Sequence, residues 1–132
     1  MATMSTVRQY AGIVGIVLLL IGVVGLIMGF GNNYSLLGLN IDMSENIVHL
    51  ATGALMAYVG FGQRDNALAR LVVGVLGAVY VLVGILGLFS ETLFGIVPHK
   101  YAILDNIVHL ALGILGLVVA YALPRNDTTV TT

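Results

Sequence analysis

The sequence predicts an all-α fold: a four-helix transmembrane bundle made of two tandem helical-hairpin repeats. Three observations support this prediction. Only 8% of the 132 residues are charged and 59% are hydrophobic, whereas a soluble domain typically carries about 25% charged residues. The chain contains four long runs without a charged residue. A short polar block at the start of the second run also recurs at the start of the fourth.

Each uncharged run is expected to form one membrane-spanning helix. A spanning helix needs about 20 mostly apolar residues, within a range of roughly 17–25. All four runs fall in this range, and the second is the shortest. The runs cover residues 11–31, 46–63, 71–90 and 106–124.

The internal repeat is visible in two blocks. Residues 46–53 recur as residues 106–113, with seven of eight positions identical and a spacing of 60. Residues 20–27 resemble residues 82–89 at a spacing of 62. Two aligned blocks indicate a duplication. We therefore predict one membrane domain over 1–132, with repeats at about 8–63 and 68–123 and a short polar tail at 124–132.

Glycines occupy matching positions in the first helix of each predicted hairpin. At about 100° per residue, those of the first helix fall within roughly one quarter of its circumference. Glycine lets the backbones of membrane helices approach closely, so we expect these residues to form packing faces. The residues predicted for helix packing are Gly15, Gly22, Gly25, Gly29, Gly53, Gly77, Gly84, Gly87 and Gly113.

The repeated blocks carry the polar residues of the spans. The set consists of an acid, an asparagine and a histidine from each repeat: Glu45, Asn46, His49, Asp105, Asn106 and His109. Each acid precedes its histidine by four residues, so both lie on one helix face. That face also carries the small residues, and an ionisable residue within a span usually faces a partner or a cavity. The pattern predicts a symmetric polar site inside the bundle, near one membrane face.

Three interpretations of this site remain open. In a purely structural role, Asn46 and Asn106 could cap the helix starts and the histidines could fix the helix register. A metal ion could be held by His49, His109, Glu45 and Asp105, whose oxygen and nitrogen ligands suit zinc, iron or manganese. Haem could use the two histidines as axial ligands. The cofactor is therefore unknown: none, a metal ion or haem.

Basic residues predict the orientation. Arg8, Arg64, Arg70 and Arg125 fall on one side of the predicted membrane, and Lys100 falls on the other. The positive-inside rule places both termini in the cytoplasm and the polar site near the outer face. No basic run suggests nucleic acid as a partner. The expected partners are the lipid bilayer, other membrane subunits or a second copy. The absence of cysteine excludes disulfides and thiolate chemistry.

The block from Asp105 to Gly113, together with Gly15, Gly22 and Gly25, resembles a family of small bacterial and archaeal membrane proteins known as domain of unknown function 4383. The resemblance covers about residues 8–122. It implies four helices in a prokaryotic cell membrane and names no substrate. We expect a small accessory or structural membrane protein that is not an enzyme; the alternative is a metal- or haem-binding protein using His49 and His109.

Overall fold

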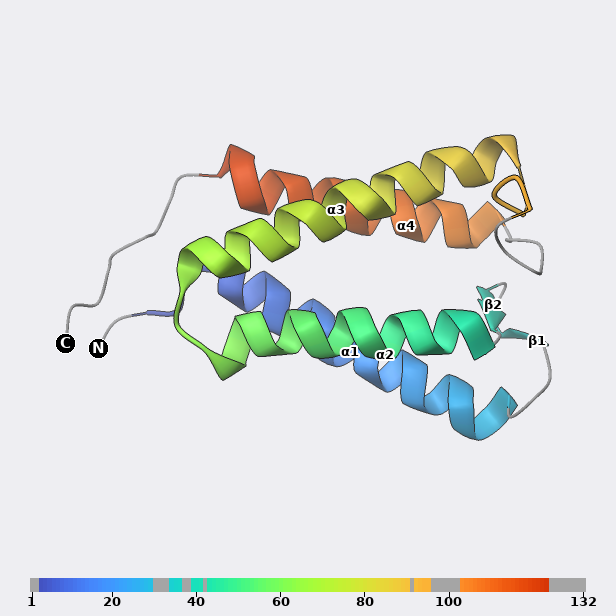
Figure 1. Ribbon diagram of the computed structural model, residues 1–132, viewed down its shortest axis with the longest axis horizontal. Helices are drawn as coiled ribbons and strands as arrows, with labels where there is room; N and C mark the ends of the chain where they lie inside the picture. The colour runs from blue at the N-terminus through green and yellow to red at the C-terminus, as the bar shows by residue number, and fades with distance from the viewer. Residues whose placement is uncertain are drawn as a thin grey trace.

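The computed structural model describes residues 3–29, 34–36, 39–41, 43–90, 92–95 and 103–123. Within them the chain folds into two antiparallel helical hairpins that lie side by side (Figure 1). The second helix of each hairpin continues into a short π-helical turn. The helices are α1 (Thr6–Gly29), α2 (Met43–Ala57) with η1 (Tyr58–Gly62), α3 (Asn66–Phe89), and α4 (Ile103–Leu117) with η2 (Val118–Ala122). The predicted all-α, four-helix fold is confirmed.

The helices begin earlier than the uncharged runs. They include Arg8, Glu45, Arg70 and Asp105, because a run without charge marks only the stretch suited to hydrocarbon, whereas a helix continues as long as its backbone is hydrogen-bonded. The start of α3 is fixed by Asp65, whose Oδ1 accepts hydrogen bonds from the Ala67 and Leu68 amides at 2.9 and 3.1 Å. This N-cap ends the short turn between the hairpins.

Three stretches of helix are long and apolar enough to span a membrane: Thr6–Met28, Asn66–Phe89 and Ile103–Ala122. Their outward surfaces are apolar, with Ile27 76% and Phe89 79% exposed. A soluble protein rarely exposes such continuous apolar surface. The fold is therefore consistent with an integral membrane protein.

The predicted span at 46–63 corresponds to α2 with η1, which is not among those three stretches of the described residues. The first ten residues of α2 include Glu45, Asn46, His49 and Thr52, which lower its mean hydropathy. However, α1 and α3 run in the same direction (Figure 1). If both cross a membrane, the chain between them must cross back, and α2 with η1 makes that return.

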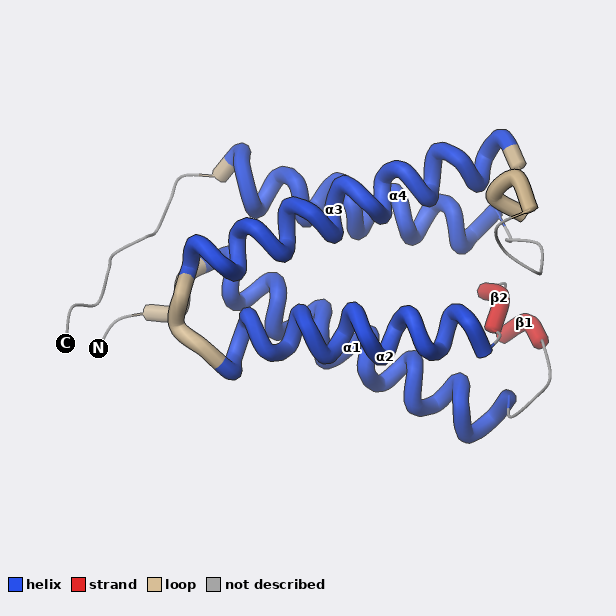
Figure 2. Tube along the Cα trace, in the orientation of Figure 1, coloured by secondary structure: helices blue, strands red, loops and turns tan. Residues whose placement is uncertain are grey.

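A small β-hairpin follows α1. Strands β1 (Tyr34–Leu36) and β2 (Leu39–Ile41) pair antiparallel, with Tyr34 opposite Ile41 and Leu36 opposite Leu39. Figure 2 shows the two strands at the end of the bundle opposite the turn between the hairpins. Pairing of the strands satisfies backbone groups at this end.

Close contacts within each hairpin are centred on glycines. A Cβ on Gly15 would lie 2.8 Å from the Gly53 carbonyl oxygen, and one on Gly113 would lie 2.7 Å from the Gly77 carbonyl oxygen. Gly22 and Gly84 likewise face leucines of the partner helix, Leu50 and Leu110. Gly29 is the last residue of α1, and its packing lies outside the described residues.

The two hairpins are joined by a core in one half of the bundle. This core is made of small and branched side chains near the starts of α1 and α3 and the ends of the other helices: Val7, Ala11, Met56, Val59, Ala69, Val73 and Ala120. The starts of α1 and α3 are also tied together by Ser5, whose hydroxyl donates to Asn66 Oδ1 at 2.7 Å. We call this half the inner half, and the half that carries the β-hairpin the outer half.

Candidate binding cavity between the hairpins

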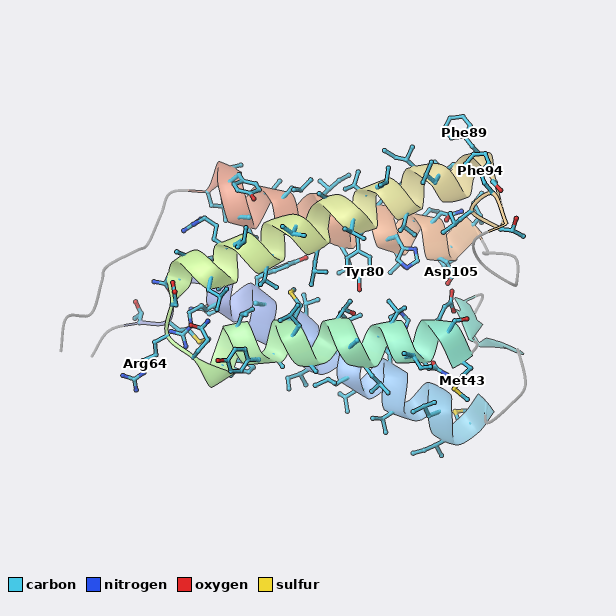
Figure 3. The ribbon with its side chains drawn as sticks, in the orientation of Figure 1. Met43, Arg64, Tyr80, Phe89, Phe94 and Asp105 are labelled. Carbon is cyan, nitrogen blue, oxygen red and sulfur yellow. The ribbon has the colours of Figure 1, made fainter. Side chains whose placement is uncertain are left out.

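A cavity of about 550 Å³ lies between the two hairpins in the outer half. One wall is the apolar face of α1, from Ile13 to Val24. The opposite wall is formed by Val108 and Leu112 of α4. Tyr80 of α3 also lines the cavity. Figure 3 shows Tyr80 between the two hairpins and Asp105 near the outer end. The cavity therefore has apolar walls and polar groups gathered at one end.

Five of the six predicted polar-site residues line this cavity: Glu45, Asn46, His49, Asp105 and His109. They come from both hairpins. Both carboxylates are buried, with Glu45 8% and Asp105 7% exposed, and the two histidines are half-buried. Asn106, the sixth, is 3% exposed and does not line the cavity. The structure thus brings the acids and histidines of the two hairpins to the lining of one cavity.

The asparagines occupy a different place from the one expected. Since α2 begins at Met43 and α4 at Ile103, Asn46 and Asn106 lie inside the first turns, so the prediction that they cap these helices is wrong. Each side-chain amide instead lies against a glycine of the preceding helix. A Cβ on Gly25 would lie 2.7 Å from Asn46 Cγ, and one on Gly87 would lie 2.7 Å from Asn106 Cγ.

Tyr80 lines the cavity but is not among the site residues predicted from the sequence. Its ring stacks on His109, with ring centroids 5.6 Å apart and an interplanar angle of 12°. The Thr52 hydroxyl donates its proton to the Val48 carbonyl at 2.7 Å and lies 3.2 Å from the Tyr80 hydroxyl. Because a threonine has one hydroxyl proton, Tyr80 must be the donor in the second bond. Tyr80 therefore connects α3 to helices of both hairpins.

A departure from the repeat could have revealed Tyr80. Thr52 is the one mismatch in the repeated block, where the second copy has Leu112, and Tyr80 aligns with Leu18 at the spacing of 62. The two residues that differ from their counterparts, Thr52 and Tyr80, form a hydrogen bond with each other between the hairpins. These paired differences mark a place where the two hairpins are unequal.

Comparison with known proteins finds one family. The family model described as "Domain of unknown function (DUF4383)" matches residues 8–122. The chain belongs to this family. The match spans all four helices, so the resemblance noted from the repeated block and the glycines is confirmed. No curated protein and no solved structure matches the chain.

Two arginines of this DUF4383 protein act at the inner end of the bundle. Arg8 Nε donates to the Gly60 carbonyl at 3.1 Å, and Arg70 Nη1 donates to the Ala120 carbonyl at 2.7 Å. Both acceptors lie in the π-helical turns that end the partner helices, where a cation is favourable. From the sequence, Arg8 and Arg70 predict only the orientation. Their spacing of 62, equal to that of the glycines, was the signal for a structural role.

The metal interpretation has no support in the described geometry. Among the residues placed by the structure, no three or more histidine, aspartate or glutamate side chains are close enough to hold one ion. A structural zinc site uses four such ligands, and a catalytic site uses three. His49, His109, Glu45 and Asp105 share a cavity without forming such a cluster.

The space between the helices narrows towards the inner half. Towards the inner half, the described residues leave a second void of about 10 Å³, lined by Tyr10, Tyr80 and apolar or glycine residues. A void of this size holds about one water molecule. Tyr10 also donates to the Leu112 carbonyl at 2.8 Å, which links α1 to α4 at this level.

Proposed function

We propose that this protein is a non-enzymatic accessory membrane protein that binds one small amphipathic molecule, drawn from the bilayer, in the cavity between its hairpins. The observation that carries the proposal is the cavity itself. It has a volume of about 550 Å³, a long apolar wall and polar groups from both hairpins at one end. Pockets for small molecules typically measure about 300–1,000 Å³ and combine apolar walls with a few polar groups.

Exposure of the α1 wall supports entry from the side. Ile13 and Leu20 line the cavity and are 62% and 59% exposed. The wall is therefore open, and in a membrane its opening would face the hydrocarbon of the bilayer. An apolar tail could enter between the hairpins without crossing water.

The hydroxyl groups at the site support a non-enzymatic role. A serine, threonine or tyrosine nucleophile needs a base within hydrogen-bond reach of its hydroxyl. The Thr52 proton is directed to the Val48 carbonyl, and the Tyr80 hydroxyl is directed to Thr52. Tyr80 meets His109 through its ring face rather than its hydroxyl. This geometry favours bracing and binding over covalent catalysis.

We infer further that the two hairpins arose by duplication. Equivalent contacts in the two hairpins support this inference: Gly15 with Gly53 and Gly77 with Gly113, Gly22 with Leu50 and Gly84 with Leu110, and Gly25 with Asn46 and Gly87 with Asn106. Glycines at these positions would allow the two helices of each hairpin to pack closely, since each added Cβ would meet atoms of the partner helix.

We also propose that the inner half faces the cytoplasm of a prokaryotic cell. The start of α1, the turn between η1 and α3 and the end of η2 lie together at that end (Figure 1). Arg8, Arg64 and Arg70 belong to these segments, and the positive-inside rule favours a cytoplasmic position for them. The cavity then opens near the outer face.

The repeat supplies a matched pair of variants for a test. Val17 lines the cavity and is 48% exposed, whereas Val79, its counterpart at the spacing of 62, is 47% exposed and does not line it. A tryptophan at residue 17 should fill the cavity, and one at residue 79 should extend into lipid. Native mass spectrometry with added dodecyl amphiphiles should show one bound molecule for the wild type and Val79→Trp, but none for Val17→Trp. Equal binding by both variants would contradict the proposal.

A further inference from the structure

We infer that the cavity binds a single acyl or alkyl chain of a lipid and that the head group of this lipid is not selected. The inference rests on the proposed function and names the chemical class of its ligand. Three properties of the cavity lead to it: the composition of its lining, its direction, and its length compared with one leaflet of a bilayer.

The lining of the cavity offers a ligand mainly hydrocarbon. Nine of the sixteen residues that line it are valine, leucine or isoleucine, and seven of these nine belong to α1. The other two, Val108 and Leu112, face them from α4 in the second hairpin. Such side chains contribute only van der Waals contacts, which are weak singly and large in sum. A hydrocarbon chain is the ligand that makes the most of these contacts.

The ionisable residues of the lining are already engaged within the protein. Each takes part in at least one interaction inside the structure, which holds for Glu45, His49, Asp105 and His109. Glu45 and Asp105 are also buried, and the Tyr80 hydroxyl donates to Thr52. Exchanging a partner inside the protein for a lipid head group brings little net gain. The chemistry of the head group should therefore not decide which lipid binds.

The direction and length of the cavity match one leaflet of a bilayer. Its α1 wall runs from Val24 inward to Ile13, along a helix that is long enough to span the membrane. This wall is roughly 16 Å long at a helical rise of 1.5 Å per residue. The hydrocarbon core of a bilayer is about 30 Å thick, so one leaflet contributes about 15 Å. A lipid chain would therefore lie along the wall in the direction that it already has in the bilayer.

The inner end of the cavity lies where such a chain would end. Towards the inner half, the space between the helices narrows to a void of about 10 Å³ beside Tyr10 and Gly77. Buried side chains of the inner core, among them Ala11 and Val59, pack in that half. A chain that enters in the outer half would reach the middle of the bundle and stop there, as a chain confined to one leaflet does.

Competition between probes separates recognition of the tail from recognition of the head group. Pairs of probes at equal mole fraction are added to the protein in lipid nanodiscs, and bound adducts are counted by native mass spectrometry. Dodecyl probes with trimethylammonium, alcohol and carboxylate heads should bind within about threefold of one another, since a specific hydrogen bond to a charged head would give about tenfold or more. With one head group kept, shortening the tail from dodecyl to hexyl should weaken binding at least about tenfold, because half of the chain leaves the wall.

A second matched pair of variants tests the length of the cavity. Ile13 lines the inner end of the α1 wall and is 62% exposed, whereas Val75, its counterpart at the spacing of 62, is 51% exposed and does not line the cavity. Ile13→Trp should shorten the space for the chain, so a dodecyl probe should lose its advantage over an octyl probe. Val75→Trp should keep the wild-type preference for dodecyl. Thermal unfolding of each variant checks that it is folded.

The outcomes separate this inference from the proposed function. If one head group binds about tenfold more tightly than the others, if hexyl binds as well as dodecyl, or if a folded Ile13→Trp keeps the wild-type preference, the ligand class is wrong and the binding function stands. If no probe binds as one equivalent, or if Val17→Trp binds like Val79→Trp, both proposals fall. The rankings on the wild type need no variant, so a misfolded Ile13→Trp leaves the inference testable.

Discussion

The side-chain amide of Asn106 lies directly against Gly87, so closely that a Cβ at residue 87 would overlap the amide oxygen. Asn46 lies against Gly25 in the same way. The Asn106 Oδ1 atom is buried and makes no hydrogen bond within the described part of the chain. The glycine therefore does more than bring two backbones together, because it leaves the space in which a buried amide is seated.

Substitution of this glycine should destabilise the second hairpin. In Gly87→Ala, the new methyl group would overlap the Asn106 amide, which has little room to move because residue 106 is 3% exposed. We expect a loss of about 1–3 kcal/mol, as for overpacking of a well-packed core. The measurement is equilibrium unfolding of the purified protein in detergent.

Two further variants make this result specific. Gly116→Ala adds the same methyl group where the nearest atoms are 3.4 Å away, an ordinary contact, and should change stability little. In Gly87→Ala/Asn106→Ala, the overlap is removed, so the double variant should lose less than the sum of the single changes. Additive losses would show that the amide is not what the glycine accommodates.

Arg70 should contribute to stability through the end of η2. Its guanidinium donates to the Ala120 carbonyl at 2.7 Å, and the residue is 9% exposed. Hydrogen bonds involving a charged group contribute about 1.5–3 kcal/mol, so Arg70→Gln should lower the unfolding free energy by about this amount. Arg64→Gln, which changes an exposed arginine of the nearby turn, is the control. Equal stability of the two variants would argue against the capping role.

The number and order of the helices could be predicted because long uncharged runs are a direct consequence of burial in hydrocarbon. The positions of the acids and histidines followed from helical periodicity, which places residues four apart on one face. The cavity could not be predicted in this way. Its volume depends on how far α1 lies from α4, which is a matter of tertiary packing and not of helical periodicity.

The structural roles of the asparagines and arginines also could not be predicted from the sequence. A capping role for Asn46 and Asn106 was part of one interpretation of the polar site, whereas the helices begin at Met43 and Ile103. The sequence shows that Arg8 and Arg70 repeat at the glycine spacing, but it does not show which carbonyl each contacts. That information requires the π-helical turns, which no propensity rule predicts.

The orientation can be checked by labelling single cysteines in a chain that contains none. An impermeant reagent added outside should label Leu36→Cys in β1 and Gly95→Cys in the turn after α3, but not Ala67→Cys at the start of α3. The reason is the arginine bias at the inner end. Labelling of Ala67→Cys alone would reverse the proposed topology.

Removal of metal should leave the protein unchanged. Since the described histidines and acids do not form a set of three potential ligands, treatment with a chelator should not shift the thermal unfolding midpoint. Zinc, iron and manganese should also be absent from the purified protein by elemental analysis. A lowered midpoint that metal restores would revive the metal interpretation.

The two histidines should differ in their contribution to stability although they occupy equivalent positions. His109 stacks on Tyr80, whereas the residue aligned with Tyr80 in the first repeat is Leu18. An aromatic pair contributes about 0.5–1.5 kcal/mol beyond its buried area. His109→Ala should therefore lower the unfolding free energy by about this much more than His49→Ala. The change Tyr80→Leu gives the second hairpin the residue of the first, and in that background the two histidine variants should become equal. If His49→Ala is as destabilising as His109→Ala in the native background, the stack is not what distinguishes the two halves.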